Sequence, residues 1–327
     1  MFNIALFGAG RIGQVHAVNI ANHPETRLFS VIDPYDVNAN MLCQQYGAKR
    51  QSIEEAMQDS EIDAVCICSA TDTHADLIEL AAKAGKAIFC EKPIDLDLSR
   101  VRDCLAVVKQ HQVPMLVGFN RRYDPQFRTL KNKLNQGAIG EPATLTITSR
   151  DPEPPGADYV KVSGGMFRDM AIHDLDMARF ILGEDPISIT AHGSCKVNPE
   201  IGAAGDIDTG VLVLEFPSGA MATIQNSRRS GYGYDQRIEL HGELGMLQAA
   251  KQNENLVSQI SEQGRQSAKP MHFFLERYKD AYIAEWQHFV DVLNGAEPEC
   301  SGDDGEYALR LADAALESLR SKKTVAL

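Results

Sequence analysis

The sequence predicts an α/β protein with two domains. The N-terminal one is a Rossmann domain, a doubly wound parallel sheet, and the C-terminal one is an α+β domain with an open, mainly antiparallel sheet. Over residues 1–120, short apolar runs alternate with amphipathic stretches, as in βαβ units. The first apolar run leads directly into Gly8-Ala9-Gly10-Arg11-Ile12-Gly13. From residue 186 to about 250 the pattern changes to period-two alternation, so the predicted domains are 1–120 and 121–327.

The first domain is expected to contain strands at residues 2–7, 28–32, 64–68, 87–90 and 115–118. Several of these runs are apolar throughout, which is typical of strands covered by helices on both faces. Helical spacing of apolar residues lies between them, at 11–21, 37–46, 74–84 and 99–110. Helices of this kind would connect the strands of a parallel sheet.

The second domain combines helices with closely spaced strands. Residues 124–135 begin with Asp-Pro, a favourable helix start. A β-branched run at 143–149 enters a Pro-rich loop at 151–156, and an amphipathic helix is expected at 166–182. Strands at 211–216 and 220–226 flank a Pro-Ser-Gly turn and predict a hairpin. The polar segment 251–270 is expected to be a surface loop, with closing helices at 273–293 and 305–320 and a last short strand at 322–327.

Charge, hydropathy and cysteine content exclude several classes of protein and several kinds of partner. With 32 Lys and Arg against 45 Asp and Glu, the net charge of −13 repels nucleic acid and anionic membranes. No apolar stretch approaches the ~20 residues of a membrane-spanning helix, and the first ten residues resemble a strand and turn instead of a signal peptide. The seven cysteines contain no CxxC pair, so neither a disulfide framework nor a thiolate zinc site is indicated. We expect a cytoplasmic protein.

The glycine turn predicts a dinucleotide site. Gly8 permits a tight turn, Gly10 lets the backbone approach a pyrophosphate, and Gly13 allows close helix–strand packing. The helix that follows offers unpaired N–H groups to the phosphates. Asp33, twenty residues after Gly13, can accept hydrogen bonds from ribose hydroxyls, which favours NAD. Lys49 or Arg50 could neutralise the 2′-phosphate of NADP, so this alternative stays open.

Glu91-Lys92-Pro93 ends the fourth expected strand. Ligands of open α/β sheets bind outside the carboxyl ends of the strands, so Glu91 and Lys92 should project towards the cofactor. The Lys92 ammonium would stabilise negative charge that develops on a reacting oxygen. The alternative is a Lys92–Glu91 pair on the surface.

Asp169, His173 and Asp176 should share one face of a helix, because they are four and three residues apart. An imidazole can take a hydroxyl proton near neutral pH, and a neighbouring carboxylate can orient it. The residues alone leave three alternatives open: a catalytic set, a solvated acidic face and a metal site.

Four motifs together resemble a known family. These are the glycine turn, CSATDTH at 68–74, Glu91-Lys92-Pro93, and GFNRRY at 118–123. In this order they are similar to the glucose–fructose oxidoreductase / inositol dehydrogenase / MocA family of NAD(P)-dependent sugar dehydrogenases. The resemblance implies that Lys92 contacts the substrate hydroxyl and the nicotinamide ribose, and that the peptide bond before Pro93 is cis. It further implies that His173 is the general base, with Asp169 as its partner and a substrate ligand.

The resemblance and the strand-end positions together give a list of candidate residues. The catalytic candidates are Lys92, Asp169 and His173, and no metal is expected. The expected cofactor-binding residues are Gly8, Gly10, Arg11, Ile12, Gly13, Asp33, Ala70, Thr71, His74, Glu91, Lys92 and Asn120. The expected substrate-binding residues are Lys92, Arg122, Asp151, Asp169, His173, Tyr232 and Tyr234. His74 could instead only begin a helix, and Asn120 and Arg122 could only make hydrogen bonds at the domain boundary.

The family implies NAD-dependent oxidation of a ring secondary alcohol in a small polyol or sugar. Residues 151–155 and 163–174 are most like members that convert myo-inositol to scyllo-inosose (2-keto-myo-inositol). The family also implies a homotetramer formed through the open sheet. Two alternatives remain: a dehydrogenase of another cyclitol or an aldose, and a non-catalytic NAD-dependent sensor.

Overall fold

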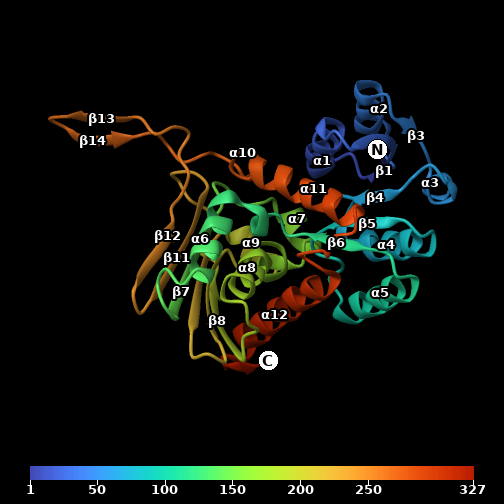
Figure 1. The fold of residues 1–327 in the computed structure, drawn as a ribbon. Helices are drawn as coiled ribbons and strands as arrows, with labels where there is room; N and C mark the ends of the chain where they lie inside the picture. Colours follow the sequence, from blue (N-terminus) through green and yellow to red (C-terminus); the bar gives the residue numbers. More distant parts are fainter. The chain divides into compact units, whose positions relative to one another are not determined.

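The computed structural model describes residues 1–327, apart from the side chain of Ala157, and consists of two compact units (Figure 1). Unit 1 contains Met1–Asn120 and Ala281–Leu309, and unit 2 contains Arg121–Asp280 and Arg310–Leu327. Residues 281–309 therefore pack with unit 1, whereas the predicted domains place them in the second. Apolar spacing reveals that a helix has a buried face, but it does not reveal which core that face covers.

Unit 1 is built on six parallel strands in the order β3-β2-β1-β4-β5-β6. This is the strand order of dinucleotide-binding Rossmann folds and confirms the predicted fold class. The strands are β1 (Phe2–Phe7), β2 (Thr26–Ile32), β3 (Lys49–Arg50), β4 (Ala64–Ile67), β5 (Ala87–Glu91) and β6 (Met115–Gly118). Only β3 was missed, because its two residues are exposed and carry no apolar run.

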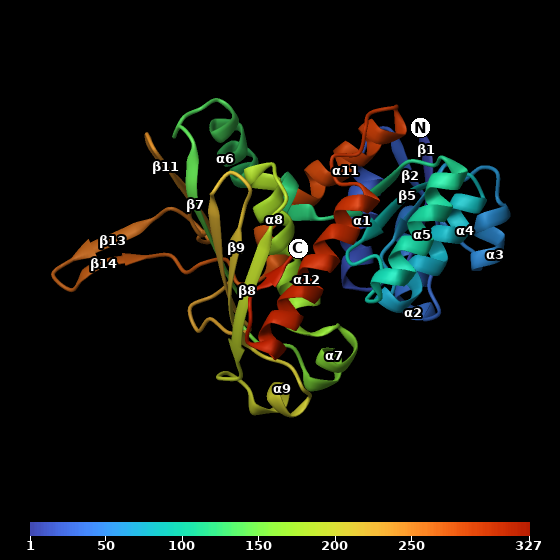
Figure 2. The same ribbon diagram turned by 90° about the horizontal axis from the view of Figure 1, so that it is seen from below.

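Helices cover both faces of this sheet. They are α1 (Arg11–Asn22), α2 (Asp36–Tyr46), α3 (Ile53–Gln58), α4 (His74–Lys83), α5 (Leu98–His111) and most of α11 (Lys279–Leu293), with 3₁₀ turns at η1 (Thr71–Thr73) and η2 (Asn120–Tyr123). On one face, Ile4 and Leu6 of β1 pack with Ile20 of α1 and with Trp286 and Phe289 of α11. Figure 2 shows α4 and α5 on the opposite face.

Unit 2 contains a seven-stranded sheet in the order β12-β11-β7-β10-β9-β8-β15. The strands are β7 (Pro142–Arg150), β8 (Ser188–Ser194), β9 (Thr209–Glu215), β10 (Met221–Ser227), β11 (Asp235–Gly242), β12 (Gly245–Ala249) and β15 (Val325–Ala326). Antiparallel pairing prevails, and β9 and β10 form the predicted hairpin. However, β7 and β10 pair in parallel, with Arg150 opposite Ser227, so their carboxyl ends meet.

Helices pack against one face of this sheet. Unit 2 contains α6 (Pro125–Asn135), α7 (Ala157–Val162), α8 (Ile172–Leu182), α9 (Pro199–Ala203), α10 (Phe274–Arg277) and the end of α12 (Gly302–Ser321). Figure 2 shows α8 and α12 on the same face. The cross-strand registers place Val211, Val213, Met221 and Met246 on the other face, where each is exposed. The second face of the sheet is therefore open and partly apolar.

The expectation of a loop over residues 251–270 is wrong. This segment contains a hairpin, β13 (Ser258–Ser261) and β14 (Gly264–Ser267), which projects away from the seven-stranded sheet (Figure 1). Its residues are polar or exposed on both faces, so the alternation that marks a half-buried strand is missing. Among the described residues, no helix has an apolar stretch long enough to cross a bilayer.

Candidate functional site

The glycine turn of unit 1 depends on Gly8 and Gly13. Gly8 has φ +96°, and an added Cβ would lie 2.6 Å from the carbonyl carbon and oxygen of Cys68. At Gly13 an added Cβ would lie 1.9 Å from the Gly8 oxygen, so helix α1 passes directly against the turn. An added Cβ at Gly10 would meet nothing within 4 Å, and no side chain caps α1. Helix α1 therefore begins where no side chain covers the turn, and the positive end of its dipole favours an anionic group there.

Asp33 directly follows β2, and its side chain is hydrogen-bonded to the backbone of the glycine turn. Its Oδ2 accepts a hydrogen bond from the Ala9 N–H at 2.6 Å, and its Oδ1 accepts one from the Tyr35 N–H at 2.7 Å. Arg50 donates to the backbone oxygens of Val31 and Asp33 and pairs with Asp36 at 3.2 Å. Lys49, the other cation considered for a 2′-phosphate, pairs with Glu61 at 3.4 Å. Both cations therefore have partners within the protein, an arrangement that favours ribose hydroxyls beside Asp33.

The loops after β4 and β5 are joined by His74. Ala70 directly precedes the turn η1, Thr71 begins it, and His74 begins α4 with its ring buried. One ring nitrogen, Nδ1, lies 2.8 Å from the Pro93 oxygen, and Nε2 lies 3.1 Å from the Ser69 oxygen. The ring thus lies between two backbone carbonyls, and a direct contact with a cofactor stays a prediction, as it does for Ala70 and Thr71.

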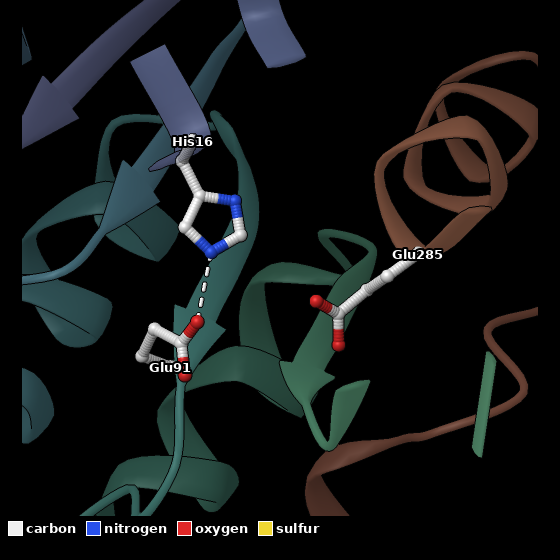
Figure 3. Close-up of side chains that lie close together, drawn as sticks. All are labelled: His16, Glu91 and Glu285. Atoms are coloured by element: carbon white, nitrogen blue, oxygen red, sulfur yellow. Dashed lines mark hydrogen bonds and ion pairs between the residues drawn. The ribbon is translucent and has the colours of Figure 1, made fainter. Parts of the chain in front are cut away.

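The end of β5 carries Glu91 and Lys92. The Lys92–Pro93 peptide bond is cis, which confirms the expectation from the family resemblance. The Lys92 side chain is half-buried. Glu91 turns inward, where its Oε1 lies 2.8 Å from Nε2 of His16 on α1 (Figure 3). Asn120, the last residue of this part of unit 1, is buried. Whether Glu91, Lys92 and Asn120 bind a cofactor stays a prediction.

In unit 2, polar residues gather where β7 and β10 end. Asp151 follows β7 and Arg228 follows β10, and the Asp151 N–H donates to the Ser227 oxygen at 3.0 Å. Burial raises the pKa of Asp151 to about 6, although the charge of Arg228 works in the opposite direction. Arg228 is only 2% exposed, and its Nε has no hydrogen-bond partner among the described residues. The strand ends therefore hold a buried cation beside an acid that titrates near neutral pH.

Asp169 joins this cluster from a wide helical turn. Its Oδ2 accepts a hydrogen bond from Nη1 of Arg228 at 2.8 Å, and its Oδ1 accepts one from the Tyr159 hydroxyl at 2.9 Å. Burial and the Asp169 charge raise the pKa of Tyr159. The turn, η3 (Phe167–Ala171), is π-helical and precedes α8, in which His173 is the second residue.

The prediction of one regular α-helix over 166–182 is therefore wrong at its start. The backbone N–H of Met166 donates to both carboxylate oxygens of Asp206, at 2.9 and 3.1 Å, where the wide turn begins. A π turn replaces i→i+4 bonding by i→i+5 bonding, so the assumed spacing of Asp169 and His173 does not apply across it. Turns of this kind occur frequently at functional sites.

The acidic residues after His173 are buried and paired with arginines. Asp176 accepts hydrogen bonds from Nε and Nη2 of Arg122 at 2.8 and 2.5 Å. Asp174 accepts from Arg121 at 2.6 Å and from Asn226 at 2.7 Å. A solvated acidic face is thus the wrong interpretation of this helix. The contacts of Arg122 support its structural alternative, and its substrate role stays a prediction.

The two candidate tyrosines differ in their surroundings. The Tyr232 side chain is 46% exposed, and its hydroxyl donates to Asp235 at 2.6 Å. Tyr234 is 6% exposed and packs edge-on against Tyr278, with ring centroids 6.1 Å apart. Because β11 begins at Asp235, opposite Arg150, Tyr234 lies at the same end of the sheet as Asp151.

Sequence reasoning missed Arg228 and Tyr159. Arg228 directly follows a strand, as Lys92 does, so the rule about strand ends could have identified it once the parallel pairing of β7 and β10 was known. No comparable signal marks Tyr159 in the short helix α7. Among the described residues, one group fits the spacing of metal ligands, namely His16, Glu91 and Glu285, and it does not include Asp169, His173 or Asp176.

Two family models match the chain. Residues 2–119 match the model described as "Oxidoreductase family, NAD-binding Rossmann fold", and residues 127–248 match "GFO/IDH/MocA C-terminal domain". The chain is 49% identical to an inositol 2-dehydrogenase of Rhizobium meliloti, with 98% of each chain covered. It is 44% identical to a myo-inositol 2-dehydrogenase of Thermotoga maritima, over 99% of this chain and 98% of the relative.

One similar solved structure contains a bound cofactor and a bound cyclitol. The scyllo-inositol dehydrogenase of Lactobacillus casei, with bound NAD(H) and scyllo-inositol, superposes with a TM-score of 0.93 at 30% identity. The match covers 100% of this chain and 99% of that one.

Proposed function

Since the chain belongs to the GFO/IDH/MocA family of oxidoreductases with an NAD-binding Rossmann fold, we propose that it oxidises a ring secondary alcohol of a cyclitol with NAD. The proposed substrate is myo-inositol and the proposed product scyllo-inosose, because relatives with 44–49% identity over nearly the whole chain are named inositol 2-dehydrogenases. The enzyme would act in the breakdown of inositol.

The residues of unit 1 fit NAD. Gly10 leaves open space at the start of α1, where the N–H groups and helix dipole favour a pyrophosphate. Asp33 is fixed by Ala9 and Tyr35 beside this turn, in the position for ribose hydroxyls. We assign cofactor binding to these residues and to Ala70, Thr71, His74, Glu91, Lys92 and Asn120. When bound, NAD supplies the acceptor for the hydride that leaves the carbinol carbon.

We assign the proton transfer to His173. An imidazole can take the hydroxyl proton near neutral pH, and loss of this proton makes the carbinol carbon a better hydride donor. Asp169 lies four residues before His173 in the chain. Arg228 and Tyr159 donate hydrogen bonds to the Asp169 carboxylate. We propose that Asp169 orients His173 and accepts a hydrogen bond from a substrate hydroxyl.

We assign charge stabilisation to Lys92. Its ammonium donates to the oxygen that loses the proton and so stabilises the alkoxide-like state. Arg122, Asp151, Tyr232 and Tyr234 are proposed to bind the other hydroxyls. Carboxylates and donors at the strand ends suit a polyol, because a ring with several hydroxyls needs acceptors as well as donors.

The observation that carries this proposal is the partly buried contact of Asp169 with Arg228 at 2.8 Å, next to a π turn and His173. Asp151 beside it has a pKa raised to about 6 by burial, and groups with such shifted pKa values gather at sites that transfer protons. The second candidate substrate is scyllo-inositol, because the L. casei structure contains it.

We further propose a homotetramer that associates through the open face of the seven-stranded sheet. The exposed side chains of Val211, Val213, Met221 and Met246 support this proposal. Light scattering should show four subunits, and Val211→Glu should reduce this number. The seven cysteines, all free thiols, suit the reducing cytoplasm that we propose as the compartment.

The proposed function is tested by NADH formation from a panel of substrates. Myo-inositol should give the highest kcat/KM among myo-inositol, scyllo-inositol and glucose. Lys92→Met and His173→Ala should each lower turnover by at least about 100-fold. NAD affinity should change little in His173→Ala and should fall by less than turnover in Lys92→Met, because Lys92 is also assigned to cofactor binding. Good turnover of glucose without turnover of myo-inositol would overturn the substrate, and unchanged turnover in either variant would overturn the role of that residue.

A further inference from the structure

Three titratable side chains meet in the interior of unit 1, on the inner side of the strand end that carries Lys92. His16 comes from α1, Glu91 from β5 and Glu285 from α11 (Figure 3). One ligand atom from each lies within 4.8 Å of the other two. His16 and Glu285 are 0% exposed and Glu91 is 9% exposed. The mechanism proposed above uses neither His16 nor Glu285.

Within this group, His16 and Glu91 are hydrogen-bonded to each other and Glu285 is not bonded to either. His16 Nε2 lies 2.8 Å from Glu91 Oε1, whereas neither oxygen of Glu285 has a hydrogen-bond partner among the described residues. The His16 ring is otherwise surrounded by aromatic rings, with centroids of Phe89 at 4.7 Å and Tyr282 at 5.7 Å. Figure 3 shows the Glu285 carboxyl group turned towards the His16–Glu91 pair.

The charges around Glu285 favour its neutral form. The ionisable groups that act on it are Glu91 from β5 and Cys66 from β4, and both oppose a second negative charge. Burial is the larger effect, and the pKa of Glu285 is raised well above its ordinary value. The pKa of His16 is also raised: burial lowers it, but Cys66 and Glu91 raise it by more.

A metal ion accounts poorly for the group. The 2.8 Å between His16 Nε2 and Glu91 Oε1 is the length of a direct hydrogen bond, and a ring nitrogen that carries the proton of this bond cannot also bind a metal ion. A protonated Glu285 is a weaker acceptor than an ionised carboxylate, and His16 Nε2 contacts Glu91 while both Glu285 oxygens lack a partner among the described residues. The single strong contact then ties the last residue of β5 to α1, the helix that starts at the glycine turn.

We propose that His16 and a protonated Glu285 are positioning residues for Lys92. His16 holds the Glu91 side chain, and Glu91 is joined to Lys92 by the peptide bond. The neutral Glu285 competes only weakly with the Glu91 carboxylate for the hydrogen bond from His16. Gly118 of β6 contributes space, because an added Cβ there would lie 3.1 Å from Glu91 Oε2. This inference rests on the proposed role of Lys92 in the reaction.

The first test compares His16→Phe, which keeps a ring without N–H groups, with His16→Gln, which retains an N–H donor. We expect His16→Phe to lower kcat on the order of 10-fold, with KM for the cyclitol and Kd for NAD within about threefold, because a misplaced catalytic group affects chemistry more than binding. His16→Gln should recover most of kcat. Equal kcat in wild type and His16→Phe would overturn the proposal.

A second measurement does not depend on activity. The rate at which an amine-reactive reagent labels Lys92, followed by mass spectrometry, should change severalfold in His16→Phe, while labelling of the exposed Lys109 stays constant. An unchanged rate at Lys92 would overturn the positioning role. If the wild type oxidises no cyclitol, the proposed function fails, but this measurement still decides the inference.

The protonation of Glu285 is tested by infrared difference spectroscopy at near-neutral pH. The carbonyl band of a protonated carboxylic acid should be present in the wild type and absent from Glu285→Gln, and this neutral isostere should retain kcat within about twofold. The same spectrum in both proteins, or an equimolar metal ion that is lost in Glu285→Gln, would overturn the assignment.

Discussion

Replacing Arg228 by Met tests how far the strand-end cluster of unit 2 depends on one buried cation. Arg228 is 2% exposed, and its Nη1 lies 2.8 Å from Asp169 Oδ2. Its charge also acts on Asp151 and Asp206. Without the guanidinium, these carboxyl groups lose that compensation. Removing one partner of a buried ion pair costs about 3–5 kcal/mol.

One remaining hydrogen bond and one protonation reduce this cost in unfolding free energy. Tyr159 still donates to Asp169 at 2.9 Å, and Asp151, with a pKa of about 6, can take up a proton. We therefore expect Arg228→Met to lose about 2–4 kcal/mol of unfolding free energy at neutral pH. The loss should be smaller below pH about 5, because Asp151 is then neutral in both proteins.

Urea denaturation followed by circular dichroism measures this difference, with Arg228→Lys as the matched control. Lysine keeps the charge but not the shape of the guanidinium, so it should recover part of the stability. If Asp169 serves the reaction, Arg228→Met should also lower kcat/KM for myo-inositol by at least about 100-fold. A free energy of unfolding within about 0.5 kcal/mol of the wild type at neutral pH would refute the reasoning.

Three further predictions concern other contacts. Asp33→Asn removes the negative charge beside the proposed ribose site, so the ratio of kcat/KM for NAD to that for NADP should fall at least about 10-fold; an unchanged ratio contradicts the role of Asp33. Gly13→Ala places a Cβ 1.9 Å from the Gly8 oxygen, so melting should show a loss of about 1–3 kcal/mol and fluorescence titration weaker NAD binding; wild-type behaviour would disprove the close packing. Burial raises the pKa of Asp151 from 3.8 to about 6, so the stability that this group contributes is present at low pH and lost as pH rises through about 6. Asp151→Asn should lack that loss, and parallel stability curves for the two proteins would contradict the buried acid.

Most of unit 1 could be predicted from the sequence, because its signals are local. The boundaries of β1 and β6 coincide with apolar runs, and the glycine turn identifies the start of α1. By contrast, the packing of Trp286 within unit 1 depends on contacts between residues more than 150 positions apart in the chain. No local pattern records such contacts.

The site in unit 2 was harder to predict. The spacing of Asp169 and His173 indicated a regular helix, but the contact of Met166 with Asp206 accompanies a π turn. Arg228 joins Asp151 only because β7 and β10 pair in parallel, which the hairpin of β9 and β10 does not reveal. The residue types at the site were predictable, whereas their partners depend on the sheet topology.

The most direct test of the proposed reaction uses myo-inositol that carries deuterium on the carbinol carbon at position 2. Mass spectrometry of the NADH and of the product follows the isotope. The account predicts one deuterium in NADH, none in the ketone, and scyllo-inosose as the product. Formation of unlabelled NADH, or no NADH at all with any cyclitol, would contradict it.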